Sequence, residues 1–136
     1  MERALRASPK TMIIWAHTGT FLSPAAVEEL LRNHPNLYFD LAIKDRRLKK
    51  PRDIYLILSG TTVHENWRRI FESYPDRFFI GSDISPGGSR HNWPLSNLPG
   101  IAGFFRSVLM QLTPATARKI AYENAERVIV FPKSRE

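Results

Sequence analysis

Two short apolar runs in the sequence each lead to a side chain that can exchange a proton. The run 78–82 ends at Asp83, and the run 11–16 ends at His17. A short apolar run between helical patterns is typical of a buried parallel strand, and parallel sheets carry their chemistry at the carboxyl ends of their strands. Asp83 and His17 are therefore our candidate catalytic residues, since a carboxylate and an imidazole can move a proton.

Both residues also have an ordinary structural interpretation. His17 could be a buried histidine with a backbone partner, and Asp83 could cap the turn after its strand. Strand alternation places His17 on the face of Ile13 and Trp15, and Gly81 is expected to leave open space beneath the Asp83 carboxylate. If one other strand separates the two runs, their backbones lie about 10 Å apart, a distance that side chains leaning toward a common axis can largely close.

The other polar residues give weaker signals. Asp40 lies inside the apolar run 37–41 and needs a partner if it is buried. It is either a structural acceptor near a strand end or a support for a site. His34 is expected in a surface turn and His64 in an exposed first helical turn, while His91 belongs to a long Pro/Gly-rich loop that could form a lid or a substrate wall.

The helical patterns alternate with the apolar runs. Signals for helix starts are Ser23-Pro24, Thr62 with Glu65, and Thr113-Pro114. The stretch 53–60 fits either a strand or a helical turn. The order of strand, then helix, predicts one α/β domain over residues 1–136, with parallel strands and C-terminal helices.

Composition narrows the class of protein. The chain has 136 residues, of which 43% are hydrophobic, and it has no cysteine. These values exclude a disordered chain, disulfides and zinc–thiolate sites. The N-terminus lacks the apolar core of a signal peptide, and no apolar run reaches the roughly 18–20 residues that a membrane helix needs. We therefore expect a cytoplasmic protein that does not enter a membrane.

The formal net charge of +7 is concentrated in the run 44–52, which holds six Lys and Arg residues. Such a run is either a solvated loop or a site for polyanions. It has no interleaved aromatic residue, so it lacks the stacking platform of a single-strand binder. Nucleic acid is therefore not the partner that we favour.

Taken together, the runs resemble the C-terminal half of the amidohydrolase-related family, the metal-dependent hydrolases and decarboxylases built on a (β/α)₈ barrel. The segments that carry the resemblance, in the family's order, are Ile13-Ile14-Trp15-Ala16-His17-Thr18-Gly19, Pro35-Asn36-Leu37-Tyr38-Phe39-Asp40-Leu41, Pro75-Asp76-Arg77-Phe78-Phe79-Ile80-Gly81-Ser82-Asp83 and Asn124-Ala125-Glu126-Arg127-Val128. They span nearly the whole chain. The resemblance implies a partial (β/α)₈ barrel whose strands correspond to barrel strands six, seven and eight.

The resemblance also implies roles for the two candidate residues. His17 is similar to the strand-six histidine that lies beside the metal-bound water in relatives. Asp83 is similar to the strand-eight aspartate that binds the metal or accepts the proton of the water. Asp83 is thus our candidate metal ligand, and zinc or another divalent ion is the implied cofactor.

The chain departs from the family in length and in ligands. A full barrel takes about 250 residues, and the paired His-x-His ligands after strand one and the strand-five histidine have no counterpart here. A catalytic zinc site normally has three protein ligands, of which this sequence offers one. We therefore expect an incomplete metal centre, and the alternative is that this chain alone binds no cofactor.

Three functions follow as hypotheses. The first is the C-terminal portion of a metal-dependent hydrolase that acts on a small-molecule substrate, truncated and inactive by itself. The second is a non-catalytic half-barrel that forms a homo-oligomer or pairs with a missing N-terminal half, because three parallel strands leave an apolar edge. The third is a basic module that binds polyanions through the run 44–52.

Overall fold

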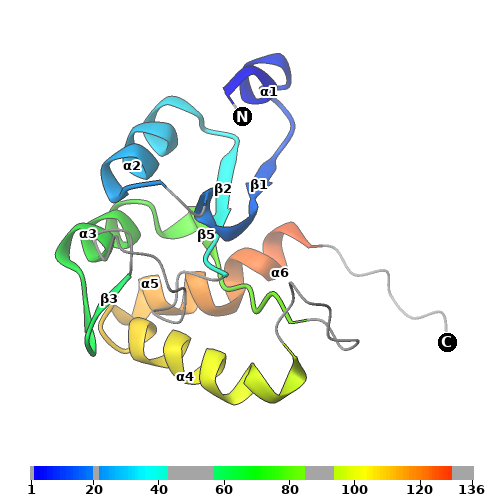
Figure 1. Ribbon diagram of the computed structural model, residues 1–136. Helices are drawn as coiled ribbons and strands as arrows, with labels where there is room; N and C mark the ends of the chain where they lie inside the picture. Colours follow the sequence, from blue (N-terminus) through cyan, green and yellow to red (C-terminus); the bar gives the residue numbers. More distant parts are fainter. Residues whose placement is uncertain (1, 20–21, 43–56, 85–93, 130–136) are drawn as a thin grey trace, which may run out of the picture.

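A three-stranded parallel sheet lies at the centre of the chain (Figure 1). The computed structural model describes residues 2–19, 22–42, 57–84 and 94–129. The strands are β1 (Ile13–Trp15), β2 (Leu37–Asp40) and β5 (Phe78–Phe79), and their order is β1-β2-β5. The parallel sheet expected from the three apolar runs is thus present, although each strand is shorter than its run.

The register of the sheet defines two faces. Trp15 pairs with Phe39, and Phe39 pairs with Phe78, so these three rings share one face. They stack along the sheet with ring centroids about 6 Å apart, at 6.0 Å and 6.1 Å. Tyr38 and Phe79 belong to the opposite face, where their rings lie 5.8 Å apart.

Two helices cover the face that carries the stacked rings. They are α2 (Pro24–Asn33) and α3 (Glu65–Ser73), which lie on the same side of the sheet in Figure 1. Their apolar residues join the buried strand residues in one core, together with Leu5 from α1 (Glu2–Ala7). Burial of this apolar surface is the main force that holds the helices on the sheet.

The local signals for two helix starts are confirmed. The Ser23 hydroxyl accepts from the Ala26 amide at the start of α2, with Pro24 at the first helical position. The Thr113 hydroxyl accepts from the Thr116 amide at the start of α5. Both are N-caps of the type that satisfies an otherwise unpaired backbone N–H group.

The expected capping box at Thr62 is wrong. Thr62 and Val63 form β4, which pairs antiparallel with β3 (Leu58–Ser59), and α3 begins after an N-cap at His64. Gln111 fixes this hairpin from outside, because its Oε1 accepts from the Val63 amide at 2.9 Å and its Nε2 donates to the Thr61 carbonyl at 2.9 Å. These tertiary contacts override the local signal for a helix start.

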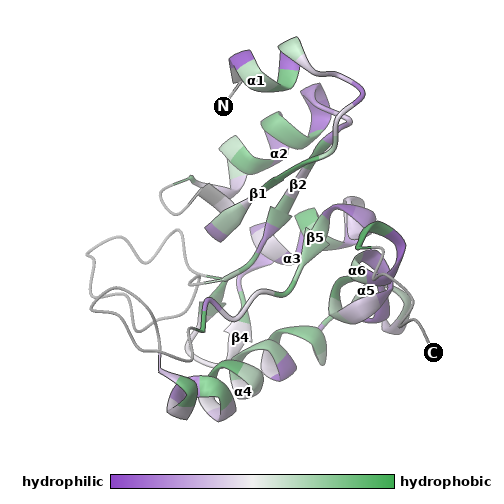
Figure 2. Cartoon of the chain, turned by 90° about the vertical axis from the view of Figure 1, so that its right-hand side faces the viewer, coloured by the Kyte–Doolittle hydropathy of each residue, from purple (hydrophilic) through white to green (hydrophobic). Residues whose placement is uncertain are grey.

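The C-terminal part of the chain is helical. After η4 (Leu95–Asn97), α4 covers Leu98–Leu109, and a continuous helical stretch is then built from α5 (Pro114–Arg118), the π-helical η5 (Lys119–Glu123) and α6 (Asn124–Val128). Figures 1 and 2 show α4 on the side toward which the carboxyl ends of the strands point.

Asn124 joins this helical stretch to the sheet. Its side chain is 1% exposed and donates to the carbonyls of Pro75 and Phe78, at 2.8 Å and 2.9 Å. Pro75 begins the short helix η3 (Pro75–Arg77), which leads directly into β5. The last helix therefore fixes the entry to the strand that ends at the candidate site.

The arrangement is a mixed α/β fold compatible with part of a (β/α)₈ barrel, with three parallel strands and helices that follow them. No helix in the described part of the chain is long and apolar enough to cross a membrane.

Candidate functional site

The two candidate residues lie at the same edge of the sheet. His17 follows the carboxyl end of β1, and Asp83 follows the carboxyl end of β5. Because β1 and β5 flank β2 in a parallel sheet, both residues leave the sheet in the same direction. Two strand spacings, about 10 Å at the backbone, separate the two strand ends.

The backbone is left-handed at both residues. His17 has φ 60° and ψ 21°, Thr18 has φ 45° and ψ 41°, and Asp83 has φ 51°. Among the described residues other than glycine, these three are the ones with positive φ. Such conformations cost on the order of 1–3 kcal/mol each and cluster at functional sites, so they mark this edge of the sheet as the candidate site.

The left-handed turn also corrects the expected orientation of His17. The sheet register places Trp15 on the face of Phe78, whereas Asp83 would continue the face of Phe79. Strict alternation would therefore have put His17 and Asp83 on opposite faces. Instead β1 ends at Trp15, and the 3₁₀ turn η1 (Ala16–Gly19) ends the alternation before His17 is reached.

The imidazole of His17 has one nitrogen that is shielded from solvent. Its Nδ1 atom is buried and has no hydrogen-bond partner in the structure. A buried polar atom without a partner costs free energy, which weakens the interpretation of His17 as a structurally paired histidine. His64 shares this property, so it is the combination with left-handed backbone that distinguishes His17.

The space expected beneath the Asp83 carboxylate is already filled. A Cβ built on Gly81 would lie 2.7 Å from Oδ1 and 2.8 Å from both Cγ and Oδ2 of Asp40. The Asp40 carboxylate therefore packs directly on Gly81, and a side chain at residue 81 would force this carboxylate to shift. The prediction of an open space at Gly81 is wrong because a neighbouring strand supplies the side chain that fills it.

Thr18 is a residue of the site that sequence reasoning missed. Its side chain is fully buried, and its hydroxyl donates to the Asp40 carbonyl at 2.6 Å. The segment after β1 is thereby attached to the end of β2. A threonine after a strand carries no local sign of such a contact, since its partner lies 22 residues further along the chain.

The described residues do not make a metal centre on their own. No group of three His, Asp or Glu side chains within these parts of the chain could hold a metal ion.

His34 is the C-cap of α2 and precedes β2, so it lies at the opposite edge of the sheet. It is also 8% exposed, and its expected place at the surface is wrong. His91 and the basic run 44–52 lie outside the described residues.

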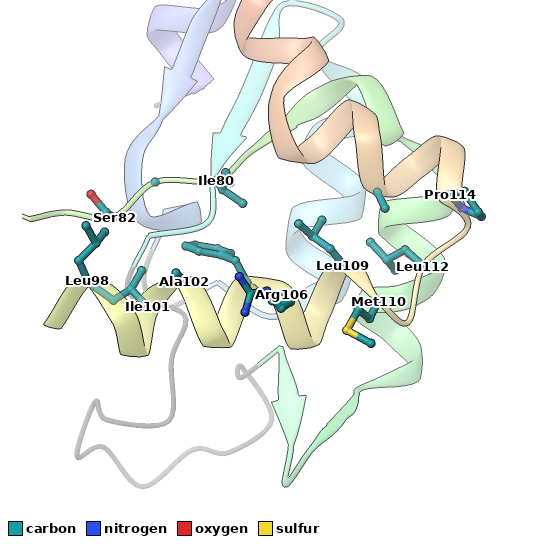
Figure 3. A pocket seen from close by; sticks show the side chains of 13 residues that line it. Ile80, Ser82, Leu98, Ile101, Ala102, Arg106, Leu109, Met110, Leu112 and Pro114 are labelled. Carbon is teal, nitrogen blue, oxygen red and sulfur yellow. The ribbon is translucent and has the colours of Figure 1, made fainter.

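An apolar groove of about 750 Å³ opens beside β5 (Figure 3). One wall is Ile80–Ser82, the segment that continues β5, and the other walls come from α4, α5 and the turn between them. Leu98 and Met110 line it and are 45% and 79% exposed. Arg106 is the charged residue in this lining. Neither His17 nor Asp83 contributes to the groove.

A family model with the description Amidohydrolase matches residues 1–131, which is nearly the whole chain. No curated protein and no solved structure matches the chain.

Proposed function

Because the chain belongs to the amidohydrolase family, we propose that it is the C-terminal portion of a metal-dependent hydrolase that acts on a small-molecule substrate. The observation that supports this proposal is the placement of His17 and Asp83. Both follow the carboxyl ends of parallel strands, where barrel enzymes carry their active sites, and both have left-handed backbone.

In this proposal His17 and Asp83 have different roles in the reaction. Asp83 would hold zinc or another divalent ion, or accept a proton, and His17 would lie beside the reacting water. A metal bound there would lower the pKa of a water molecule toward about 7 and polarise a carbonyl group. The described residues supply too few ligands, so the remaining ones would come from an N-terminal half, and the isolated chain would be inactive.

The gene provides the first test of this proposal. We expect the reading frame to continue upstream of the Met1 codon and to encode a His-x-His motif after a strand pattern. An in-frame stop codon directly upstream would contradict the truncation.

A second test uses a completed barrel. Co-expression with an N-terminal half that carries the motif should give metal-dependent hydrolysis, which Asp83→Ala should abolish. The neighbouring substitution Ser82→Ala is the matched control and should keep activity. Full activity of Asp83→Ala would contradict the role of Asp83.

A second candidate function is a non-catalytic half-barrel that pairs with another chain. Both outer strands of the described sheet carry exposed aliphatic residues, namely Ile14 in β1 and Ile80 directly after β5. An apolar edge of this kind promotes pairing, and the groove beside Ile80 extends the apolar surface.

Light scattering tests the pairing. We expect a mass above the 15.7 kDa of one chain, and a decrease toward that value for Leu98→Glu, which places a charge in the groove. Leu95→Glu introduces the same charge at a residue that is 61% exposed and outside the groove lining, so it should leave the mass unchanged. A clean monomer for the unmodified chain would contradict this candidate.

A further inference from the structure

Asp40 contacts the segments that follow both neighbouring strands. On the β1 side, its backbone carbonyl accepts from the buried Thr18 hydroxyl at 2.6 Å. Its own carboxylate accepts from the Ala42 amide through Oδ1, also at 2.6 Å. Asp40 is the last residue of β2, the central strand, so it is placed to connect the carboxyl ends of all three strands.

On the β5 side, the contact is steric. The Cβ position of Gly81 lies at nearly equal distances from Cγ and both carboxylate oxygens of Asp40, so a face of the carboxylate rests on the glycine. Gly81 stands two residues before Asp83. The carboxylate therefore limits how closely this segment can approach β2.

A strand-end cap is the simpler interpretation of Asp40. The hydrogen bond from the Ala42 amide alone would fulfil that role. A cap does not explain why a β-branched threonine is held at φ 45°, an uncommon backbone conformation for such a residue. Nor does it explain why the carboxylate lies where the Cβ of a larger residue 81 would be.

We infer that Asp40 is a positioning residue: through its backbone carbonyl on the Thr18 side and its carboxylate on the Gly81 side, it sets the separation between His17 and Asp83. The inference rests on the proposed function only in taking these two residues as the site. Asp40 need not touch substrate or metal in this role.

A double-mutant cycle measures the contact with Gly81. Gly81→Ala should raise the unfolding equilibrium constant roughly five- to a hundredfold, because overpacking of this kind is destabilising. In the Asp40→Ala background the clashing atoms are gone, so the same substitution should change the constant by less than about twofold. An equal cost in both backgrounds would overturn the inference. If Asp40→Ala does not fold, Asp40→Ser takes its place, since it also lacks the carboxylate.

Backbone amide signals in NMR spectra of the 136-residue chain report the positioning itself. Asp40→Ala should move the signal of Asp83, because the carboxylate that rests on Gly81 is lost, and Asp40→Asn, which keeps an oxygen acceptor of the same shape, should largely restore it. The backbone carbonyl that accepts from Thr18 is kept in both variants, so the His17 side is tested at Thr18. Asp76→Ala is the matched control, because it removes another partly exposed aspartate, one that pairs with Lys119 away from this edge.

The outcomes separate the hypotheses. If Asp40→Ala moves the signal of Asp83 no further than the control does, Asp40 is only a cap and the inference is wrong. Thr18→Val removes the donor to the Asp40 backbone carbonyl and should move the His17 signal, with rescue by Thr18→Ser, which keeps the hydroxyl. None of these measurements depends on activity. If the completed barrel is inactive but the double-mutant cycle and the NMR signals behave as expected, the proposed hydrolase is rejected and the role of Asp40 still holds.

Discussion

Substitution of Asn124 should destabilise the fold more than its single side chain suggests. Asn124→Ala removes two hydrogen bonds to the carbonyls of Pro75 and Phe78 and leaves the fully buried carbonyl of Phe78 without a donor. An unsatisfied buried carbonyl costs about 1–3 kcal/mol, and water can reach the partly exposed Pro75 more easily. We therefore expect a loss of about 2–4 kcal/mol, a large part of the roughly 5–15 kcal/mol that stabilises a typical domain.

Urea denaturation followed by circular dichroism measures this loss. With a urea dependence of about 2 kcal/mol per molar, the middle of the usual range, the unfolding midpoint should fall by about 1–2 M. Asn97→Ala is the matched control, since Asn97 precedes α4 without a side-chain capping bond, and surface substitutions of this kind stay within about 0.5 kcal/mol. If Asn124→Ala is as stable as this control, the attachment of the last helix to β5 is not what holds the strand.

Two further predictions concern the helix contacts and the hairpin. Burial alone raises the pKa of Glu72, but hydrogen bonds from Thr116 and Thr113 outweigh it and lower the pKa below the ordinary value of 4.5. The stabilisation is therefore complete above pH 4.5 and is lost as the pH falls through the lowered value. Glu72→Gln should be less stable than the unmodified chain at pH 7, and the two unfolding curves should converge in acid. Gly60→Ala should cost about 1 kcal/mol in thermal unfolding, because the β3–β4 turn holds residue 60 at φ 63°; an unchanged midpoint would contradict that strain.

Two helix starts and the parallel sheet could be predicted from short stretches of the sequence. The start signals at Ser23 and Thr113 depend on groups within three residues, and both are confirmed. The parallel sheet was predictable because three apolar runs alternate with helical patterns. The capping signal at Thr62 failed because a hairpin and a contact from Gln111, 48 residues beyond Val63, decide the structure there.

The candidate site was predictable only in its topology. Parallel strands place His17 and Asp83 at one edge, which needs no knowledge of side-chain packing. The left-handed turn after β1 and the contact of Asp40 with Gly81 depend on neighbours from other strands. Such long-range packing leaves no periodic pattern in the sequence, and Thr18 was overlooked for the same reason.

Zinc titration of the completed barrel, monitored by calorimetry, tests the assignment of Asp83 most directly. We predict one bound zinc per barrel, no tight binding by the 136-residue chain alone, and a more than tenfold loss of affinity for Asp83→Ala but not for Ser82→Ala, since loss of even an indirect supporting residue costs about 10–100-fold. Equal affinity of the Asp83→Ala barrel, or tight binding by the isolated chain as a monomer, would contradict the account.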